Sequence, residues 1–325
     1  MRAVICRDYA DPPRLALGEA TVREPAAGEV LVDVHAAAIS FMDVLMARGL
    51  YQMRPPLPYT PGTDAAGVVR AVGAGVAHVR PGDRVACGNW TGAWAECMIA
   101  PAAQVLPLPP ELDFATACTV RYAYGTAYYA LARRALLQPG ETVFVSGAAG
   151  GVGLAAVDVA RHLGARVIAG VGAPERAEIA LSRGAEAVVV YGREDLKSRI
   201  IELTDGQGLD VGLDNVGGEV FGAMSRLMAW GGRLLPVGFA GGTIPALPAN
   251  LPLLKNYVLV GAFWGAWAAR HPARSARQDA QLLRLVAEGR LRPQVDAVFP
   301  LAQFDHALAR LAGRSVRGRI VLQVC

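Results

Sequence analysis

A glycine-rich segment in the middle of the chain has the composition of a loop that approaches a phosphate group. It reads Gly-Ala-Ala-Gly-Gly-Val-Gly over residues 147–153, follows the apolar run TVFVSG (142–147) and opens a helical stretch. Small residues let the backbone turn sharply beside a pyrophosphate, and the free amides of a helix N-terminus favour its negative charge. A tight structural turn is the plain alternative. The strand–glycine–helix context meets the requirement of the dinucleotide fingerprint, so we expect a dinucleotide site here.

The end of the next strand indicates which dinucleotide binds. An Asp or Glu about 20 residues past the glycines would bond the ribose 2′-hydroxyl and select NAD. The chain has RVIAGVGAPER (166–176) there, with small residues and no acid at the strand tip; Arg176 follows within a helical turn, and Tyr191 ends the next strand. An arginine matches a phosphate dianion in charge and in fork geometry. Arg176 could also be a solvated residue beside Glu175 and Glu178, but the missing acid favours NADPH.

The elements that must position these residues alternate between apolar, strand-like runs and helical stretches. This alternation predicts an α/β fold with a doubly wound parallel sheet of the Rossmann type, with helices on both faces. The six strand-like runs are TVFVSG (142–147), RVIAGVG (166–172), AVVVY (187–191), LDVGLDNV (209–216), GRLLPVGF (232–239) and YVLVGAF (257–263).

The sequence on both sides of this region predicts a second, strand-rich domain. Before it, short strand-like runs such as 30–39 and 65–73 are separated by turn signals at close intervals. After it, helices near 275–289 and 303–312 lead to a last strand. Because the parallel sheet is already complete, we expect this tail to return to the first domain. The predicted dinucleotide-binding domain is 124–265, and the other domain is 1–123 and 266–325.

Composition and charge exclude several classes of protein. An apolar fraction of 53% and a charged fraction of 18% are typical of a well-buried globular chain, not of a disordered one. The net charge of +4 is small and dispersed, which argues against a nucleic-acid surface. The five cysteines include no C-x-x-C pair, and no secretory signal or membrane-spanning run is evident. We therefore expect a protein of the reducing cytoplasm.

At these residues the chain resembles the zinc-independent medium-chain dehydrogenases/reductases, and more narrowly the NADPH:quinone oxidoreductases that include zeta-crystallin. The likeness runs from end to end. It implies a strand-rich GroES-like domain beside the Rossmann domain, hydride transfer from NADPH to a quinone, and a homodimer formed through YVLVGAF. The segments that carry it are SFMDVLMARGLY (40–51), PYTPGTDAAGVVRAVGAGV (58–76), PGDRV (81–85), GTAYYAL (125–131), LQPGETVFVSGAAGGVGLAAV (137–157), LDNVGG (213–218), GRLLPVGFAGG (232–242), LLKN with VGAFWGAW (253–267) and GRIVL (318–322).

The resemblance also implies a set of cofactor-binding residues. Those expected at the pyrophosphate are Gly150, Gly151, Val152 and Gly153, and those around the 2′-phosphate are Gly172, Arg176 and Tyr191. Those expected along the adenosine and nicotinamide ends are Asn215, Gly238, Phe239, Phe263, Trp264 and Gly265, with Arg314 or Arg319 over the cofactor and with Ser40, Asp43 and Thr126 near the nicotinamide. The family usually has Asn at the position of Ser40 and Lys at that of Arg176, and the latter change keeps the charge.

The zinc ligands of the metal-dependent relatives have no counterparts here. Those relatives use an early Cys and a Gly-His-Glu, where this chain has Ser40 and Gly62-Thr63-Asp64. The five histidines are scattered singly, and tetrahedral zinc needs three or four suitably spaced ligands. We therefore expect no metal.

Without zinc no Lewis acid polarises a simple ketone, so the acceptor must itself be reactive, as a quinone or an activated alkene is. The protein then contributes mainly positioning. Side chains that could assist are Asp43, Tyr51, Tyr122 and Thr126, although packing is the ordinary role of a tyrosine. Arg121 is expected at the surface, where it could also meet an anionic group such as a CoA phosphate.

Two other functions stay open. One is an NADPH-dependent enoyl reductase for α,β-unsaturated carbonyls or acyl thioesters, which shares the glycine loop and the lack of zinc. The other is an NADPH-binding structural or RNA-binding protein, since the resemblance includes zeta-crystallin, which has such uses. The small, dispersed charge speaks against nucleic acid as a partner.

Overall fold

The computed structural model describes residues 1–313 and 315–325, and it divides the chain into two compact units. The first consists of Met1–Tyr122, Ala268–Gly289 and Pro293–Cys325, and the second of Ala123–Trp267 and Arg290–Arg292. Residues Arg290–Arg292 belong to the second unit because the backbone N–H of Arg292 donates to Asp158 of that unit at 2.5 Å. Arg314, one of the two arginines expected over the cofactor, lies outside the described residues.

The second unit is built on a parallel sheet. Its strand order is β10-β9-β8-β11-β12-β13, and every strand pair in it is parallel. The predicted doubly wound α/β fold is therefore confirmed. The strands are β8 (Thr142–Val145), β9 (Arg166–Val171), β10 (Ala187–Val190), β11 (Leu209–Asp214), β12 (Met228–Pro236) and β13 (Val258–Leu259).

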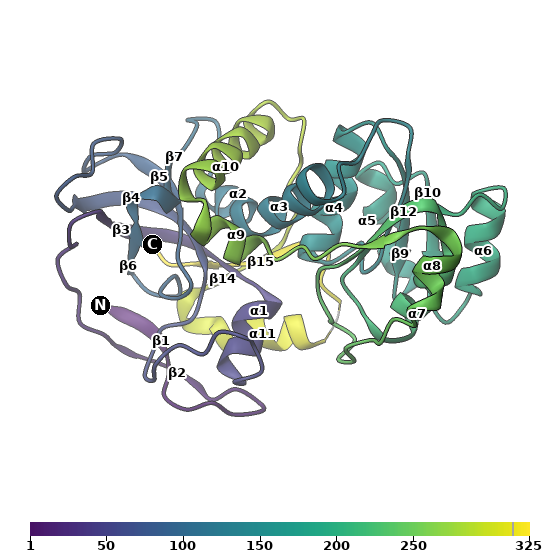
Figure 1. Cartoon of the computed structure of the whole chain (residues 1–325). Helices are drawn as coiled ribbons and strands as arrows, with labels where there is room; N and C mark the ends of the chain where they lie inside the picture. The colour runs from purple at the N-terminus through teal and green to yellow at the C-terminus, as the bar shows by residue number, and fades with distance from the viewer. Residues whose placement is uncertain (314) are drawn as a thin grey trace. The chain divides into compact units, whose positions relative to one another are not determined.

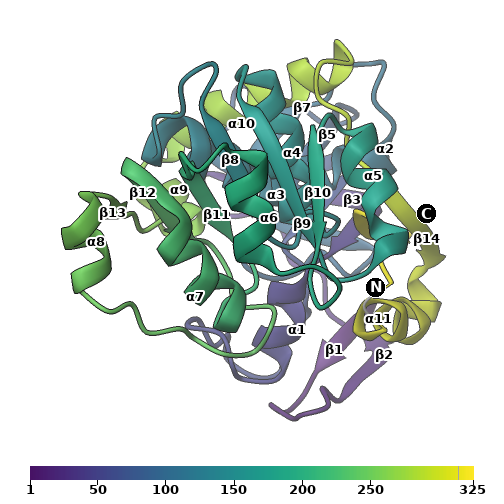
Figure 2. The ribbon, with the colours of Figure 1, turned by 90° about the vertical axis from the view of Figure 1, so that its right-hand side faces the viewer.

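Helices cover both faces of this sheet. In Figure 2, α6 and α7 pack side by side on the face toward the viewer, and α4 lies behind the sheet. The enclosed core includes Phe144, Ile168 and Leu234, all fully buried. The helices of the unit are α4 (Gly151–His162), η3 (Pro174–Arg176), α5 (Ala177–Ser182), α6 (Leu196–Leu203), α7 (Gly218–Leu227) and α8 (Asn250–Lys255), with α3 (Val120–Tyr128), η2 (Tyr129–Arg134) and α9 (Trp264–Arg270) at its limits.

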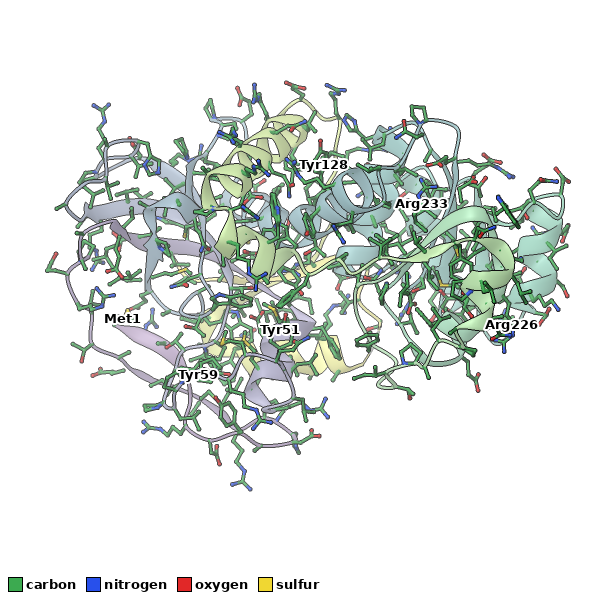
Figure 3. The ribbon with its side chains drawn as sticks, viewed as in Figure 1. Met1, Tyr51, Tyr59, Tyr128, Arg226 and Arg233 are labelled. Atoms are coloured by element: carbon green, nitrogen blue, oxygen red, sulfur yellow. The ribbon has the colours of Figure 1, made fainter. Side chains whose placement is uncertain are left out.

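The last strand of the parallel sheet is shorter than expected. The run 257–263 was predicted as one strand, but only Val258–Leu259 pair with β12. The ladder ends because β12 ends at Pro236, which has no N–H to donate. The side chain of Arg233 in β12, labelled in Figure 3, donates to both carboxylate oxygens of Glu141, at 2.9 and 2.6 Å.

The first unit is strand-rich, as predicted. Its main sheet has the order β14-β15-β3-β4-β5-β7, with β6 also paired to β3 (Figure 1). The strand β15 pairs with β3, Ile320 opposite Ile39, so the chain's tail does return to the N-terminal region. The strands are β1 (Arg2–Cys6), β2 (Leu15–Glu19), β3 (Glu29–Ile39), β4 (Asp64–Val72), β5 (Arg84–Gly88), β6 (Cys97–Pro101), β7 (Val105–Pro107), β14 (Val295–Pro300) and β15 (Arg319–Gln323).

Short helices and one long helix complete the first unit. Trp94 is fully buried in its core and donates its indole N–H to the Ala38 carbonyl at 3.2 Å. No helix in the described part of the chain is long and apolar enough to cross a membrane. The helices are α1 (Phe41–Ala47), η1 (Ala102–Gln104), α2 (Phe114–Ala117), α10 (Pro272–Ala287), η4 (Leu301–Gln303) and α11 (Phe304–Ala312).

Close packing of α4 against the turn after β8 leads to a stability prediction. A Cβ on Gly153 would lie 2.1 Å from the Gly147 carbonyl oxygen, so Gly153→Ala must push the helix away from the turn. We expect the free energy of unfolding to fall by about 1–3 kcal/mol, the usual cost of overpacking.

The matched control is Gly222→Ala in α7 of the same unit, where a Cβ would meet nothing within 4 Å. It should leave stability unchanged or raise it by up to about 1 kcal/mol through helix propensity. Urea unfolding followed by circular dichroism measures both variants. Equal stability of Gly153→Ala and wild type would contradict the packing argument.

Candidate functional site

The glycine-rich turn of the second unit forms an open cradle at the start of α4. Gly150 is the N-cap residue, and no side chain of the described residues caps the helix. The first backbone N–H groups of a helix have no partner inside it, so here they are left for a ligand. Gly147 has φ +61°, a conformation that favours glycine. This turn has the shape and the donors to hold a pyrophosphate.

A buried polar network lies beneath the cradle, and its members were not predicted as site residues. The Ser146 hydroxyl donates to Asp214 Oδ1 at 2.5 Å, and the Asn215 backbone N–H donates to Ser146 Oγ at 2.8 Å. Burial raises the pKa of Asp214, while the Ser146 hydroxyl and two backbone N–H groups oppose that rise. Ser146 and Asp214 are both fully buried. The only sequence signal was a polar residue at the end of each apolar strand.

The turn after β9 brings Gly172 and Arg176 together. Arg176 belongs to η3, and its Nη1 lies 4.0 Å from the place where a Cβ of Gly172 would be. Its Nε is buried and has no hydrogen-bond partner among the described residues. A buried guanidinium nitrogen without a partner is costly, so an anion bound at this turn would stabilise it.

Other predicted residues gather at the carboxyl ends of the parallel strands. Tyr191 follows β10, and its hydroxyl oxygen accepts from the Gly147 N–H at 3.4 Å. A Cβ on Gly147 would lie 3.6 Å from the Asn215 side chain, so Asn215 borders the same turn. The Gly238 N–H donates to the Asp214 carbonyl at 3.2 Å, and Phe239 follows it. Carboxyl ends of neighbouring strands are the usual ligand position in such a sheet.

The remaining predicted residues of this unit lie farther along its chain. Trp264 is buried, and its ring would be 2.9 Å from a Cβ on Gly125 of α3, next to the buried Thr126. Phe263, just before it, is 47% exposed. The hydroxyl of Thr126 and these aromatic rings therefore belong to the second unit, while Ser40, Asp43, Tyr51, Tyr122 and Arg319 belong to the first.

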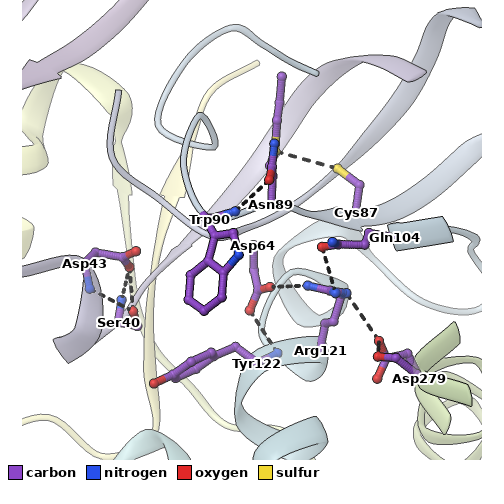
Figure 4. Close-up of polar contacts among 12 residues, drawn as sticks. Ser40, Asp43, Asp64, Cys87, Asn89, Trp90, Gln104, Arg121, Tyr122 and Asp279 are labelled. Atoms are coloured by element: carbon purple, nitrogen blue, oxygen red, sulfur yellow. Dashed lines mark hydrogen bonds and ion pairs between the residues drawn. The ribbon is translucent and has the colours of Figure 1, made fainter. Parts of the chain in front are cut away.

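In the first unit, Ser40 and Asp43 form a capping box at the start of α1 (Figure 4). The backbone N–H and the hydroxyl of Ser40 donate to Asp43 Oδ2 at 2.7 and 2.6 Å. Burial raises the pKa of Asp43 to about 6, although these hydrogen bonds oppose it. Burial and the nearby Asp43 carboxylate also raise the pKa of Tyr51 to about 12, so this phenol stays protonated at neutral pH. Figure 3 labels Tyr51 in the loop that follows α1.

Arg319 adds a buried positive charge to this group. The pairing of Ile320 with Ile39 places it opposite Ser40, and its guanidinium carbon lies 5.6 Å from the centre of the Tyr122 ring. Arg319 is 6% exposed, and its Nε and Nη2 have no hydrogen-bond partner among the described residues. Burial raises the pKa of Tyr122, and the Arg319 charge partly offsets that rise. Asp43, Tyr51, Tyr122 and Arg319 thus share one electrostatic environment.

Arg121 does not lie at the surface, so the expectation of a surface arginine facing solvent or a CoA phosphate is wrong. It is 7% exposed, and its guanidinium lies 3.7 Å from Asp64 Oδ1 and 3.3 Å from Asp279 Oδ2 (Figure 4). It also donates to Gln104 Oε1 at 2.9 Å. The charge of Arg121 is needed here because two carboxylates are buried beside it.

This network holds the backbone of Tyr122. Asp64 Oδ2 accepts from the Tyr122 N–H at 3.0 Å, so the position of the phenol depends on Asp64. Burial raises the pKa of Asp279 to about 7, with Arg121 opposing the rise. Asp64, Gln104 and Asp279 were not predicted from the sequence, because residues 64, 104 and 279 meet only in the folded chain.

No group of three or more His, Cys, Asp or Glu side chains in the described residues is arranged to hold a metal ion. Asp64 stands where the metal-dependent relatives have Glu. It forms an ion pair with Arg121 and accepts a hydrogen bond from the Tyr122 backbone N–H. That the chain binds no zinc stays a prediction, since it rests on which side chains occupy those positions.

Comparison with known proteins agrees with this architecture. Residues 26–110 match the model of the alcohol dehydrogenase GroES-like domain, and residues 151–281 match that of the zinc-binding dehydrogenases. "Quinone oxidoreductase-like protein 2" of Rattus norvegicus is 38% identical over 99% of this chain and 92% of its own length. The chain belongs to the medium-chain dehydrogenase/reductase family. The predicted membership and its GroES-like and Rossmann domains are thereby confirmed.

Two further members of the family bear on function. The crystal structure of Escherichia coli quinone oxidoreductase complexed with NADPH is 29% identical, with a TM-score of 0.91 and full coverage of both chains. A polyketide synthase of Mycobacterium tuberculosis, "Mycocerosic acid synthase-like", is 33% identical over 92% of this chain, which matches 14% of that much longer protein. One dehydrogenase/reductase framework thus occurs both as a separate enzyme and within a synthase.

The shared arginine of the first unit generates a prediction about stability and pH. Arg121→Met leaves Asp64 and Asp279 buried without their cation, which should cost about 3–5 kcal/mol of unfolding free energy at pH 8. A carboxyl whose folded pKa is raised loses stability as the pH rises through that pKa, here about 7 for Asp279. Removing Arg121 raises these pKa values further, so the loss should be smaller at pH 5.

Urea unfolding at pH 5 and pH 8 measures this difference. Arg80→Met is the control, because the Arg80–Asp83 pair is solvent-exposed and worth at most about 0.5 kcal/mol. A destabilisation by Arg121→Met that is equal at both pH values would show that the two carboxylates are not its cause.

Proposed function

We propose that this chain is an NADPH-dependent oxidoreductase that reduces a quinone-like acceptor without zinc. The cradle at the start of α4 supports dinucleotide binding, since it lacks Cβ atoms where a phosphate must approach and offers uncapped helix N–H groups. The relatives named quinone oxidoreductase, one of them solved with NADPH, support the cofactor and the acceptor class.

The proposed preference for NADPH over NADH rests on Arg176. Its Nε is buried without a partner in the described part of the chain, at a turn whose strand tip has no acidic residue. Asp or Glu at this tip would repel a 2′-phosphate, whereas a guanidinium attracts it. Gly172 leaves room for the approach, because a Cβ there would meet the Arg176 guanidinium at 4.0 Å.

The chain's own residues would then bind NADPH, orient its nicotinamide end and donate a proton to the acceptor. Bound NADPH supplies a hydride, and a quinone or an activated alkene is electrophilic enough to accept it without a Lewis acid. We propose that Ser40 and Thr126 orient the nicotinamide end. Tyr51 and Tyr122 are protonated at neutral pH because burial raises the pKa of each phenol, so either can donate to an oxygen that gains negative charge.

Enoyl reduction is the second candidate. The similarity to a segment of a polyketide synthase favours it, as does the protonated Tyr122 phenol beside the buried Arg319. Hydride addition to an alkene carbon builds an enolate, which needs an oxyanion partner and a proton donor. The third possibility, a structural or RNA-binding protein, has no support in the dispersed charge of +4.

A homodimer and a cytoplasmic location also belong to the proposal. Val258 and Leu259 of the edge strand β13 are 51% and 48% exposed. An apolar edge strand left bare is an aggregation hazard, which pairing with a second copy would remove.

Cofactor choice can be tested at Arg176. Arg176→Gln removes the charge at the Gly172 turn but keeps a side chain of similar length, so KM for NADPH should rise about 10- to 100-fold, the range that loss of a charge-assisted hydrogen bond allows. KM for NADH should change less than about 2-fold, because NADH has no 2′-phosphate. Arg226→Gln on α7, an exposed arginine, is the control. An unchanged preference for NADPH would show that another group reads the phosphate.

Acceptor choice can be tested with the two phenols. The rate of NADPH oxidation is measured with a simple quinone and with an enone or acryloyl thioester, in the presence of EDTA. Turnover of the quinone should be faster. Tyr51→Phe and Tyr122→Phe should each slow alkene reduction at least about 10-fold more than quinone reduction, because the oxygen anion formed from a quinone can take its proton from water, whereas an enolate must be protonated at carbon. Faster turnover of the alkene by the wild type would make the chain an enoyl reductase. Loss of turnover in EDTA would contradict zinc independence.

A further inference from the structure

A buried aspartate interrupts the apolar face of α4. Asp158 is fully buried between Val157 and Val159, about two helical turns beyond Gly150, where the helix starts. A carboxylate in such a place is unfavourable unless other groups supply hydrogen bonds and a compensating charge. Asp158 is too deep in the unit to touch a bound dinucleotide, so its presence is explained by the segments that it holds.

The Asp158 carboxylate joins segments that are far apart in the sequence. Its Oδ2 accepts from the Tyr124 hydroxyl at 3.0 Å and from the Arg292 backbone N–H at 2.5 Å. Its Oδ1 accepts from Arg161 Nη2 at 3.1 Å, and the same nitrogen donates to the Arg290 carbonyl at 2.9 Å. Arg161 therefore balances the charge, while the two bonds to Oδ2 fix α3 and the segment around Arg292 to α4.

Tyr124 is the donor in its hydrogen bond with Asp158. The tyrosine is buried, and both burial and the Asp158 carboxylate raise the pKa of the phenol well above its ordinary value, so it stays protonated. A hydroxyl that donates to a carboxylate forms a charge-assisted hydrogen bond, which is roughly twice as strong as a neutral one. The Tyr124–Asp158 bond is therefore a strong link between α3 and α4.

The two residues that follow Tyr124 in α3 belong to the proposed nicotinamide end of the site. Gly125 lies against Trp264, whose ring would be 2.9 Å from a Cβ at position 125, and Thr126 is buried next to it. A shift of the Tyr124 backbone along the helix would move both residues and the contact with the tryptophan. The start of α4, at the other side of the link, is the proposed pyrophosphate site. The Tyr124–Asp158 bond thus connects the two ends of the proposed dinucleotide site.

We propose that Asp158 is a positioning residue for hydride transfer, because it sets the place of Gly125 and Thr126 relative to the start of α4 through the Tyr124 hydroxyl. The inference rests on the proposed binding of NADPH at the glycine-rich turn. The start of α4 holds the phosphates, whereas α3 aligns the nicotinamide. Loss of the link therefore leaves binding intact and slows the reaction, since a misplacement of about 1 Å can cost about 100-fold in rate.

Tyr124→Phe tests the link, because it keeps the buried ring and removes only the hydroxyl. The dissociation constant for NADPH, measured by isothermal titration calorimetry, should stay within about 2-fold of wild type. At saturating NADPH, kcat should fall about 10- to 100-fold with a quinone and with an enone alike, because hydride donation is common to both. Tyr129→Phe is the matched control: phenylalanine keeps the stack of this ring on Trp267, with 4.9 Å between the centroids, so neither constant should change more than about 2-fold.

Two variants of Asp158 separate the hydrogen bond from the charge. Asp158→Asn keeps an oxygen at the Oδ2 position for the Tyr124 hydroxyl and the Arg292 N–H, so kcat should stay within about 3-fold of wild type. Asp158→Ala should lower kcat at least as much as Tyr124→Phe does. Adding Tyr124→Phe to it should cause no further loss, because both changes break one interaction. If Asp158→Ala does not fold, Tyr124→Phe and Asp158→Asn decide the question.

A further readout needs neither cofactor nor acceptor. Amide hydrogen exchange at residues 124–128 of the free protein should be faster in Tyr124→Phe than in wild type, because the link to α4 is lost. Unchanged exchange, unchanged kcat, or a loss of NADPH affinity as large as the loss of kcat would each overturn the inference. If wild type reduces neither acceptor, the proposed function fails, and the exchange experiment still decides whether Asp158 holds α3.

Discussion

Helix α4 can start beside the turn after β8 only because position 153 has no side chain: the Gly147 carbonyl oxygen lies 2.1 Å from where a Cβ would be. The helix also begins at Gly150 without a side-chain cap on its first N–H groups. It also forces the neighbouring strands to support the turn from below with polar groups, because the backbone of the turn needs partners where the core is otherwise apolar. The buried Ser146–Asp214 pair and the Tyr191 hydroxyl, which accepts from the Gly147 N–H, meet that need.

In the second unit, therefore, the proposed cofactor site and the stability of the fold depend on the same few atoms. Asp214 is fully buried and carries a raised pKa, and its carboxylate accepts three hydrogen bonds, from the Ser146 hydroxyl and from the backbone N–H groups of Val216 and Gly217. A charge in such a place is retained when it is fully hydrogen-bonded, and removing one partner costs more than the pair itself is worth. The turn proposed to hold the pyrophosphate is thus one end of a buried hydrogen-bond network.

In the first unit, several charged side chains are buried close to one another. Asp64 and Asp279 share Arg121, and Arg319 lies over the Tyr122 ring near Asp43. Taking these charges out of water is unfavourable, so their arrangement is better explained by the position it gives to Tyr122 and Tyr51 than by net stability. Protonated Tyr51 and Tyr122 phenols, the latter under the buried Arg319 guanidinium, suit an acceptor whose oxygen gains negative charge during reduction.

The sequence by itself determined the parallel sheet, the glycine-rich turn and the basic residue after β9, because each depends on neighbours within about 20 residues: periodicity, strand-to-helix context and the missing acid are all local. It also indicated the strand-rich unit and the return of the tail. It could not show that Arg121 is buried between Asp64 and Asp279, that the edge strand β13 is limited to Val258–Leu259, or that the Tyr191 hydroxyl lies near Gly147. These contacts join residues from 17 to 158 positions apart, as Gln104–Arg121 and Arg121–Asp279 illustrate. Only the tertiary structure decided them, because the pairing of buried charges and hydrogen bonds depends on which side chains the folded strands bring within a few ångströms of each other.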